Sequence, residues 1–181
     1  MIITINGTPG SGKSTIAKFI AKKLGMKHYS MGDLRRKMAM ERGMTIEEFN
    51  KLGEKEGWTD TEADKYQIKL AKEENNFVID GRLSWHFIPG SIKIFVKADL
   101  KKTAERVFKD QRKSEKKYKN VSEVLDEMKE RIESDVKRYK KYYGIKNVYD
   151  IINYDIVLDT SYLTIGQMCD EVLKAVKAFN R

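Results

Sequence analysis

The chain has 181 residues, a formal net charge of +9 at pH 7 and 40% hydrophobic residues. This length suits one compact domain with a sizeable core, but not two domains with independent cores. A single cysteine, Cys169, excludes an internal disulfide and fits a reducing compartment, and no stretch approaches the roughly 20 apolar residues of a membrane span. The expected first strand begins so close to Met1 that it leaves no room for a signal peptide, so we expect a cytoplasmic protein with no membrane partner.

The positive charge fits three kinds of partner or surface: a nucleic acid, an acidic small substrate, or a solvated lysine-rich exterior. Lysines are spread along the whole chain and are mostly mixed with glutamate, which favours the latter two. Arginine is scarce, and its planar guanidinium suits phosphate better than an ammonium does, so the place of each arginine is informative. The sequence carries no recognised RNA-binding motif, and an ATP-regulated RNA-binding protein therefore stays only an alternative.

The first predicted elements are a strand over Ile2–Asn6 and a helix over Ser14–Leu24, joined by a glycine-rich loop. The loop has the pattern G-x-x-x-x-G-K-[ST], and its residues are Gly7, Thr8, Pro9, Gly10, Ser11, Gly12, Lys13, Ser14 and Thr15. Glycines allow backbone N–H groups to surround a polyphosphate, and the N-terminus of the helix adds a positive dipole end. We expect Lys13 to contact the β- and γ-phosphates of a nucleoside triphosphate, with the Ser14 hydroxyl as a Mg²⁺ ligand.

A polar helical insert is predicted over residues 31–75, after a short second strand over Lys27–Ser30. Thr45 has the capping-box pattern of a helix start, and a further helix is expected over Asp60–Glu73. Arg35 lies in the first turns of the insert, where it could bind a monophosphate, although its basic neighbours also fit a solvated helix face. A helical insert suits a second substrate, but an ordinary surface excursion fits the pattern equally well.

The next strong motif follows the buried strand predicted over Phe77–Asp80. In an open parallel sheet the carboxyl ends of the strands line the ligand crevice, so Asp80 is expected to hold Mg²⁺ together with Ser14. Arg82 comes two residues later, where it could hold an acceptor phosphate. An ordinary Asp-Gly turn is the alternative.

The second half of the chain is predicted to contain two strands and three helices. The strands cover Ile92–Val96 and Tyr154–Leu158, and Thr164 opens the final helix with a capping-box pattern. One helix runs from a cap at Asp99 to about Arg112, and another covers about Val121–Tyr143. The charged stretch 113–120 between them is predicted to be a mobile loop, which suits a lid, but an ordinary surface excursion fits the pattern equally well.

Arg131, Asp135 and Arg138 share one face of the helix that follows this lid, because they are four and three residues apart. Such a triplet is often an exposed salt-bridge stripe. Because arginine is rare here and the triplet follows the lid, the two arginines are candidates to clamp the transferring phosphoryl group, with Asp135 orienting one of them.

Together these motifs resemble the nucleoside monophosphate kinases, and among them the archaeal-type cytidylate kinases, over essentially the whole chain. The resemblance implies an α/β P-loop kinase: a parallel five-stranded sheet flanked by helices, with a helical monophosphate-binding insert and a short lid. We expect one domain over residues 1–181, whose core covers 1–29, 76–112 and 144–181. The insert would cover about 30–75, and the lid with its following helix about 113–143.

The resemblance implies ATP-dependent, Mg²⁺-assisted phosphorylation of CMP or dCMP by a protein that we expect to be a monomer. It implies catalytic roles for Lys13, Arg82, Arg131 and Arg138. The substrate-binding residues that it implies are Ser30, Gly32, Asp33, Arg35, Asp64, Arg82, Arg131, Asp135 and Arg138. An adenylate kinase or another small-metabolite kinase is the alternative within the same class.

One position departs from the pattern of the bacterial cytidylate kinases. These carry an aspartate directly after the Asp-Gly-Arg motif that helps to read cytosine, whereas this chain has Leu83 there. Cytosine would then be read by other groups, and Asp64, Ser84 and Asp33 are the candidates.

Overall fold

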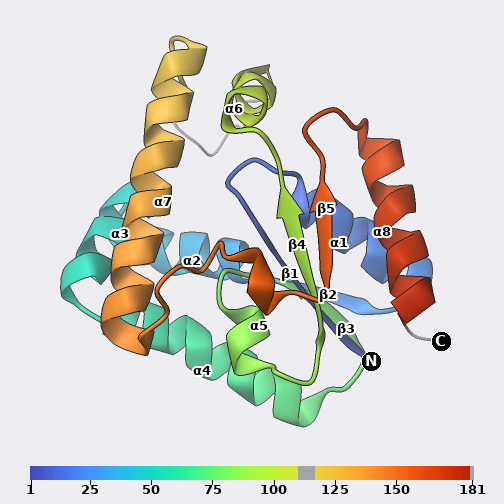
Figure 1. Cartoon of the computed structure of the whole chain (residues 1–181). Helices are drawn as coiled ribbons and strands as arrows, with labels where there is room; N and C mark the ends of the chain where they lie inside the picture. The colour runs from blue at the N-terminus through green and yellow to red at the C-terminus, as the bar shows by residue number, and fades with distance from the viewer. Residues whose placement is uncertain (110–116, 180–181) are drawn as a thin grey trace.

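The chain is described from a computed structural model that covers residues 1–109 and 117–179. Within these ranges the strands form a five-stranded parallel sheet in the order β2-β3-β1-β4-β5 (Figure 1). The strands are β1 (Ile2–Gly7), β2 (Lys27–Ser30), β3 (Phe77–Asp80), β4 (Ile92–Lys97) and β5 (Ile156–Asp159). The register pairs Asp80 with Ile5 on one side and Ser30 on the other, so the carboxyl ends of three strands meet around Asp80.

Helices cover both faces of the sheet, as predicted. On one face α1 (Lys13–Leu24) and α8 (Ile165–Phe179) pack together against alternate side chains of the central strands. Cys169 lies in this core and is 3% exposed, so it is a buried side chain. On the opposite face Phe77 and Ile79 of β3 pack against Met31, Leu70 and Ile88.

The insert between β2 and β3 is helical, as predicted. It consists of α2 (Met31–Met40), α3 (Ile46–Lys55) and α4 (Trp58–Glu73). The predicted capping box at the start of α3 is present, because the Thr45 hydroxyl accepts from Glu48 N and the Glu48 carboxylate accepts from Thr45 N. A separate small core around Phe49 holds α2 and α3 together.

The long helix α7 (Val121–Tyr143) has the predicted bounds and stands beside α3 and α6 (Leu100–Lys109). The predicted Asp99 cap of α6 is present, since its carboxylate accepts from Lys102 N. Residues 113–116 of the expected lid, and residues 110–112 at the predicted end of α6, lie outside the described part of the chain. In the described ranges no helix is long and apolar enough to cross a membrane.

The prediction for the last strand was partly wrong. The strand begins at Ile156, whereas Tyr154 follows a 3-10 helix, η1 (Ile151–Asn153), and its hydroxyl bonds Val148 O and Asn6. A one-turn helix, α5 (Ser84–Phe87), was also not predicted. Both helices are too short to show a helical repeat in the sequence.

Candidate active site

The glycine-rich loop joins β1 to α1 at the carboxyl edge of the sheet. Gly10 and Gly12 have φ angles of 73° and 87°, in the left-handed region that favours glycine. A Cβ on Gly7 would collide with the carbonyl oxygen of Val96. Gly12 immediately precedes α1 and has no side chain with which to cap it, so the helix N-terminus faces the loop with backbone N–H donors. The loop therefore has the backbone of an anion site.

Asp80 lies at the end of β3 beside this loop, where three side chains contact its carboxylate. Ser14 Oγ donates to Oδ1 over 2.9 Å and Ser30 Oγ donates to the same oxygen over 3.2 Å. His28 Nε2 lies 2.8 Å from the other oxygen, Oδ2. Burial opposes ionisation of Asp80, but the hydrogen bond from His28 and the charge of Lys13 hold its pKa below the usual value. The group is therefore a carboxylate near neutral pH.

Ser14 and Asp80 fit the chemistry of a Mg²⁺ site. A hydroxyl and a carboxylate are hard oxygen donors, and Mg²⁺ is commonly held by one or two protein oxygens together with water and substrate phosphates. Among the described residues, no group of three histidine, cysteine or acidic side chains could hold a metal ion alone. A magnesium ion at Ser14 and Asp80 would thus depend on oxygens from a bound polyphosphate.

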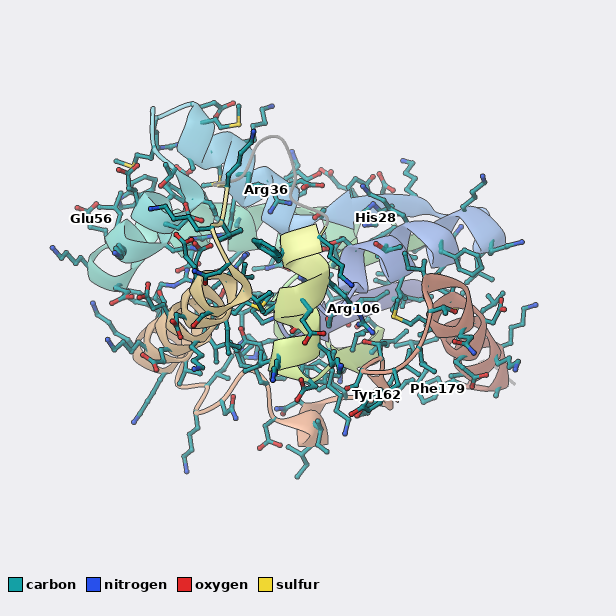
Figure 2. The ribbon with its side chains drawn as sticks, turned by 90° about the horizontal axis from the view of Figure 1, so that it is seen from above. His28, Arg36, Glu56, Arg106, Tyr162 and Phe179 are labelled. Carbon is teal, nitrogen blue, oxygen red and sulfur yellow. The ribbon has the colours of Figure 1, made fainter. Side chains whose placement is uncertain are left out.

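Cations from four separate elements gather around the loop, and we call Lys13, Arg36, Arg82 and Arg131 the cation cluster. Burial, followed by the positive charges of the other three members, lowers the pKa of Lys13 to about 7, although the charge of Asp80 acts in the opposite direction. Burial and the charge of Arg82 also lower the pKa of Arg131. Figure 2, which looks down on the carboxyl ends of the strands, shows Arg36 on α2 and His28 on β2. A bound polyanion would relieve the repulsion between these positive charges, so the cation cluster is a candidate polyanion site.

Arg82 is held by groups from three parts of the chain. Its Nε donates to Asp135 over 2.8 Å, and its Nη1 donates to Gly7 O over 2.6 Å. The ring of Tyr149 lies 5.3 Å from the guanidinium carbon. In the described part of the chain, Arg82 Nη2 is buried and has no hydrogen-bond partner. One donor of a rigidly oriented guanidinium is therefore left for a ligand.

Arg35 does not lie where it was expected. Its guanidinium donates to Asp60 over 2.6 Å, to Thr59 O over 2.9 Å and to Asn50 over 3.1 Å, and it stacks on Phe49. These contacts direct it into the insert, whereas Arg35 was expected to bind the acceptor phosphate.

The neighbouring residue, Arg36, is the one that joins the cation cluster. It forms an ion pair with Asp33 over 2.5 Å, and its charge lowers the pKa values of both Lys13 and Arg131. Successive helical residues point about 100° apart, which is why Arg35 and Arg36 face different surroundings.

Arg138 also departs from the expectation of a phosphate clamp. It is 1% exposed, and its Nη1 donates to both oxygens of Asp60 over 2.7 and 2.8 Å, while its Nη2 donates to Asp135 over 2.5 Å. Asp135 also accepts from Arg82 and from the Tyr149 hydroxyl. Burial disfavours its charged form, but the flanking arginines hold the pKa of Asp135 well below its usual range. Arg138 therefore orients Asp135, and Asp135 orients Arg82.

Asp64 lies apart from the cation cluster, among buried polar groups at α4, α5 and α7. Burial raises its pKa to about 6, although it accepts hydrogen bonds from Tyr143 and from Gln67 Nε2. In the described residues, Gln67 Oε1 and Ser84 Oγ are buried without a partner. Leu83 packs against Tyr139 and Val148, so the residue that replaces the bacterial aspartate belongs to the apolar core.

A cleft of about 1500 Å³ opens between the insert and the first half of α7. Asp33 and Arg36 line it on the insert side, and Glu123, Glu127 and Glu130 line it on α7. The cleft borders the cation cluster at Arg36 and is large enough for a nucleotide. The glycine-rich loop does not line it.

Sequence reasoning missed three side chains that shape the site: His28, Asp60 and Tyr149. His28 and Ser30 are two residues apart on a strand and therefore share a face, which was the available signal for His28. The partners of Asp60 and Tyr149 are far away in the sequence, so their roles had no local signal.

Comparison with known proteins gives one consistent family. The family described as "Cytidylate kinase-like family" matches residues 2–162. The cytidylate kinase of Methanocaldococcus jannaschii is 43% identical over 166 residues, which are 89% of each chain. That of Methanocella arvoryzae is 38% identical over 176 residues, which are 97% of each chain.

Solved structures with the same architecture are more distant in sequence. A crystal structure of an uncharacterized protein from Eubacterium ventriosum has a TM-score of 0.72 and 21% identity, and covers 98% of this chain and 99% of its own. Shikimate kinase from Aquifex aeolicus has a TM-score of 0.58 and 19% identity, over 99% and 98% of the two chains. These likenesses establish a P-loop kinase fold.

Proposed function

Because the chain belongs to the cytidylate kinase-like family, we propose that it transfers the γ-phosphoryl group of ATP to CMP or dCMP. The observation that carries this proposal is the cation cluster, in which the loop lysine meets arginines from α2, the end of β3 and α7. The loop and its lysine are the groups that hold the donor triphosphate. The additional arginines supply charge for a second phosphate, as a kinase with a phosphorylated acceptor needs.

The donor triphosphate occupies the loop Gly7–Thr15. Backbone N–H groups and the N-terminus of α1 bind its oxygens, and Lys13 contacts the β- and γ-phosphates. Ser14 and Asp80 are the protein ligands proposed for Mg²⁺. When bound there, Mg²⁺ neutralises charge on the β- and γ-phosphates and helps to place them for in-line transfer.

The acceptor phosphate is held by Arg36 and by the free Nη2 donor of Arg82, while Arg131 stabilises the charge of the transferring group. Ser30, Gly32 and Asp33, which surround the start of α2, complete this side of the site. Arg35, Asp135 and Arg138 act through other residues, because their charged groups are used in buried ion pairs. This division follows the principle that phosphoryl transfer needs positioning and charge more than covalent chemistry.

The cytosine base is proposed to meet Asp64, Gln67 and Ser84. Cytosine offers an amino group as donor and O2 and N3 as acceptors. Gln67 Oε1 and Ser84 Oγ are buried polar atoms with no partner in the described residues, and satisfying them favours a base with matching groups. Uracil presents a carbonyl where cytosine has the amino group. This carbonyl accepts hydrogen bonds, as Gln67 Oε1 does, so the two could not form a hydrogen bond.

A coupled assay of ADP formation tests the proposal with CMP, dCMP, UMP, AMP, GMP and shikimate as acceptors. CMP and dCMP should have the highest kcat/KM, and Lys13→Ala should remove the activity. A preference for AMP or for shikimate would contradict the cytidylate assignment, and no turnover of any acceptor would contradict the kinase assignment. We further propose that the enzyme works in the cytoplasm, where ATP and nucleoside monophosphates are available and a single buried thiol stays reduced.

A further inference from the structure

His28 is a partly buried polar side chain beside the proposed metal site to which the mechanism above gives no role. It lies on β2 two residues before Ser30, so both side chains project from the same face of the strand. Its ring is 16% exposed, and its Nε2 lies 2.8 Å from Asp80 Oδ2. Because a carboxylate only accepts hydrogen bonds, Nε2 must carry the hydrogen of this pair.

The contacts of Asp80 show what this hydrogen bond controls. An ionised carboxylate offers about four acceptor positions. Ser14 and Ser30 both use Oδ1, and His28 uses one position on Oδ2. The position that is left lies on Oδ2, the oxygen that His28 contacts.

The two serines alone would hold the carboxylate less firmly than the histidine does. Both hydroxyls rotate about their Cβ–Oγ bonds, and both contact the same oxygen, so the carboxylate can turn about them. The imidazole is a rigid ring anchored on a strand of the sheet, and it contacts the opposite oxygen. A donor at each end of the carboxylate fixes its plane.

We propose that His28 is a positioning residue for the metal step: it fixes the Asp80 carboxylate and leaves one Oδ2 position for Mg²⁺ or for a water bound to the ion. The inference rests on the proposed function, because it takes Ser14 and Asp80 as the Mg²⁺ ligands. Outer partners of this kind orient the residues that bind a metal, and losing one typically costs about 10–100-fold in metal affinity or activity.

The experiment measures binding of the non-hydrolysable β,γ-imido analogue of ATP by isothermal titration calorimetry, with Mg²⁺ and with EDTA. The readout is the factor by which Mg²⁺ tightens binding, which needs no phosphoryl transfer and no acceptor. His28→Ala and His28→Phe should reduce this factor about tenfold, with little change in EDTA. His28→Gln places an amide donor near Nε2 and should restore most of it. If the chain phosphorylates no monophosphate, this readout still tests His28.

Controls separate positioning from a general effect on folding. His86, the other histidine of the chain, lies outside the site on α5, and His86→Ala should leave the Mg²⁺ factor unchanged. In an Asp80→Asn background the His28→Ala change should have no further effect, because the residue acts through that carboxylate. An unchanged factor in His28→Ala and His28→Phe would overturn the proposal. So would a loss that His28→Gln does not relieve, or one that persists beside Asp80→Asn.

Discussion

Lys13 and Arg131 are cations with no counter-charge bonded to them in the described part of the chain. Each lies close enough to Arg82 and Arg36 for their like charges to lower its pKa. Such an arrangement costs free energy in the empty protein and is relieved when phosphate oxygens enter. The same groups that destabilise the free site therefore stabilise charge that develops during transfer.

Replacing Arg131 by alanine should separate catalysis from stability. Removing one preorganised donor of this type lowers kcat by about a hundredfold or more, and Lys13→Ala should do the same. The melting temperature should not fall, because the change relieves repulsion within the cation cluster. Steady-state kinetics at saturating substrates and thermal unfolding measure the two effects.

The matched control for this prediction is Lys129→Ala. Lys129 lies two residues earlier on α7 and is half exposed in a surface ion pair with Asp126, so kcat should stay close to that of the wild type. An Arg131→Ala protein that turns over normally would show that α7 does not contribute charge to the reaction.

The pKa of Lys13 predicts that triphosphate binding takes up a proton. In the free protein burial and neighbouring charges lower this pKa to about 7. Phosphates favour the ammonium form and raise the pKa, so at pH 8 the complex holds up to about one more proton than the free components. The affinity for the triphosphate should therefore fall as the pH rises above 7. Below pH 7 the lysine is charged both in the free protein and in the complex, so it no longer makes the affinity depend on pH.

Calorimetry at pH 8 in two buffers of different ionisation enthalpy measures this uptake. Lys13→Met should abolish it, while Lys18→Met, at an exposed position of the same helix, should preserve it. Equal binding enthalpies in the two buffers for the wild type would mean that Lys13 is already charged in the empty site.

The site residues that could be read from the sequence are those whose partners are local. The loop Gly7–Thr15, Ser14 and Asp80 follow from motifs at strand ends, and the topology brings those ends together. Arg35 and Arg36 could not be distinguished, because the choice depends on Asp60, which is 25 residues from Arg35. Arg138 has the same difficulty, since Asp60 is 78 residues away from it.

At the scale of elements, a buried chain of alternating charges joins the insert to α7 and to the loop. Its members are Arg35, Asp60, Arg138, Asp135 and Arg82. Asp60 of α4 is the link that contacts both α2 and α7. Each buried charge in this chain is compensated by its neighbours. Removing one member therefore leaves a neighbouring charge buried without its partner, which lowers the free energy of unfolding.

Asp60→Asn should destabilise the protein by about 3–5 kcal/mol, because it removes the carboxylate that pairs with Arg35 and one of the two that pair with Arg138. Glu62→Gln, on the same helix, removes an exposed partner of Arg42 and should cost less than about 1 kcal/mol. Urea unfolding of both variants measures the difference. Similar decreases in the free energy of unfolding for the two variants would mean that Asp60 does not stabilise the contact between the insert and α7.

The elements themselves were largely predictable because their signals are local. Capping boxes at Thr45 and Thr164 and the apolar run Phe77–Ile79 mark real boundaries. The last strand was predicted to begin at Tyr154, but the hydroxyl of this residue accepts from Asn6 and donates to Val148 O in the core beside β1. The hydrogen bond between Tyr154 and Asn6 joins residues that are 148 positions apart, so the sequence around Tyr154 could not predict it.

At the scale of the whole molecule, exposed apolar side chains are spread over separate elements. They include Met40 on α2, Ile152 on η1 and Phe179 on α8. Scattered residues of this kind are normal on a monomer, whereas a stable dimer needs a continuous apolar patch. We therefore expect sedimentation equilibrium to give the mass of one chain at micromolar concentration, and a concentration-dependent dimer would contradict this.

The net charge of +9 should not make the protein a specific nucleic-acid binder, because its lysines are mostly mixed with glutamate along the chain. The acidic side of the cleft, with Glu123, Glu127 and Glu130 on α7, would repel a nucleic-acid backbone near the site. A fluorescent single-stranded RNA should bind with a Kd no tighter than about 10⁻⁶ M at physiological salt and weaken steeply as salt rises. Anisotropy titrations with and without MgATP should coincide, and excess RNA should leave CMP phosphorylation unchanged. Tight RNA binding that requires ATP, in a protein that phosphorylates no monophosphate, would favour the RNA-binding alternative instead.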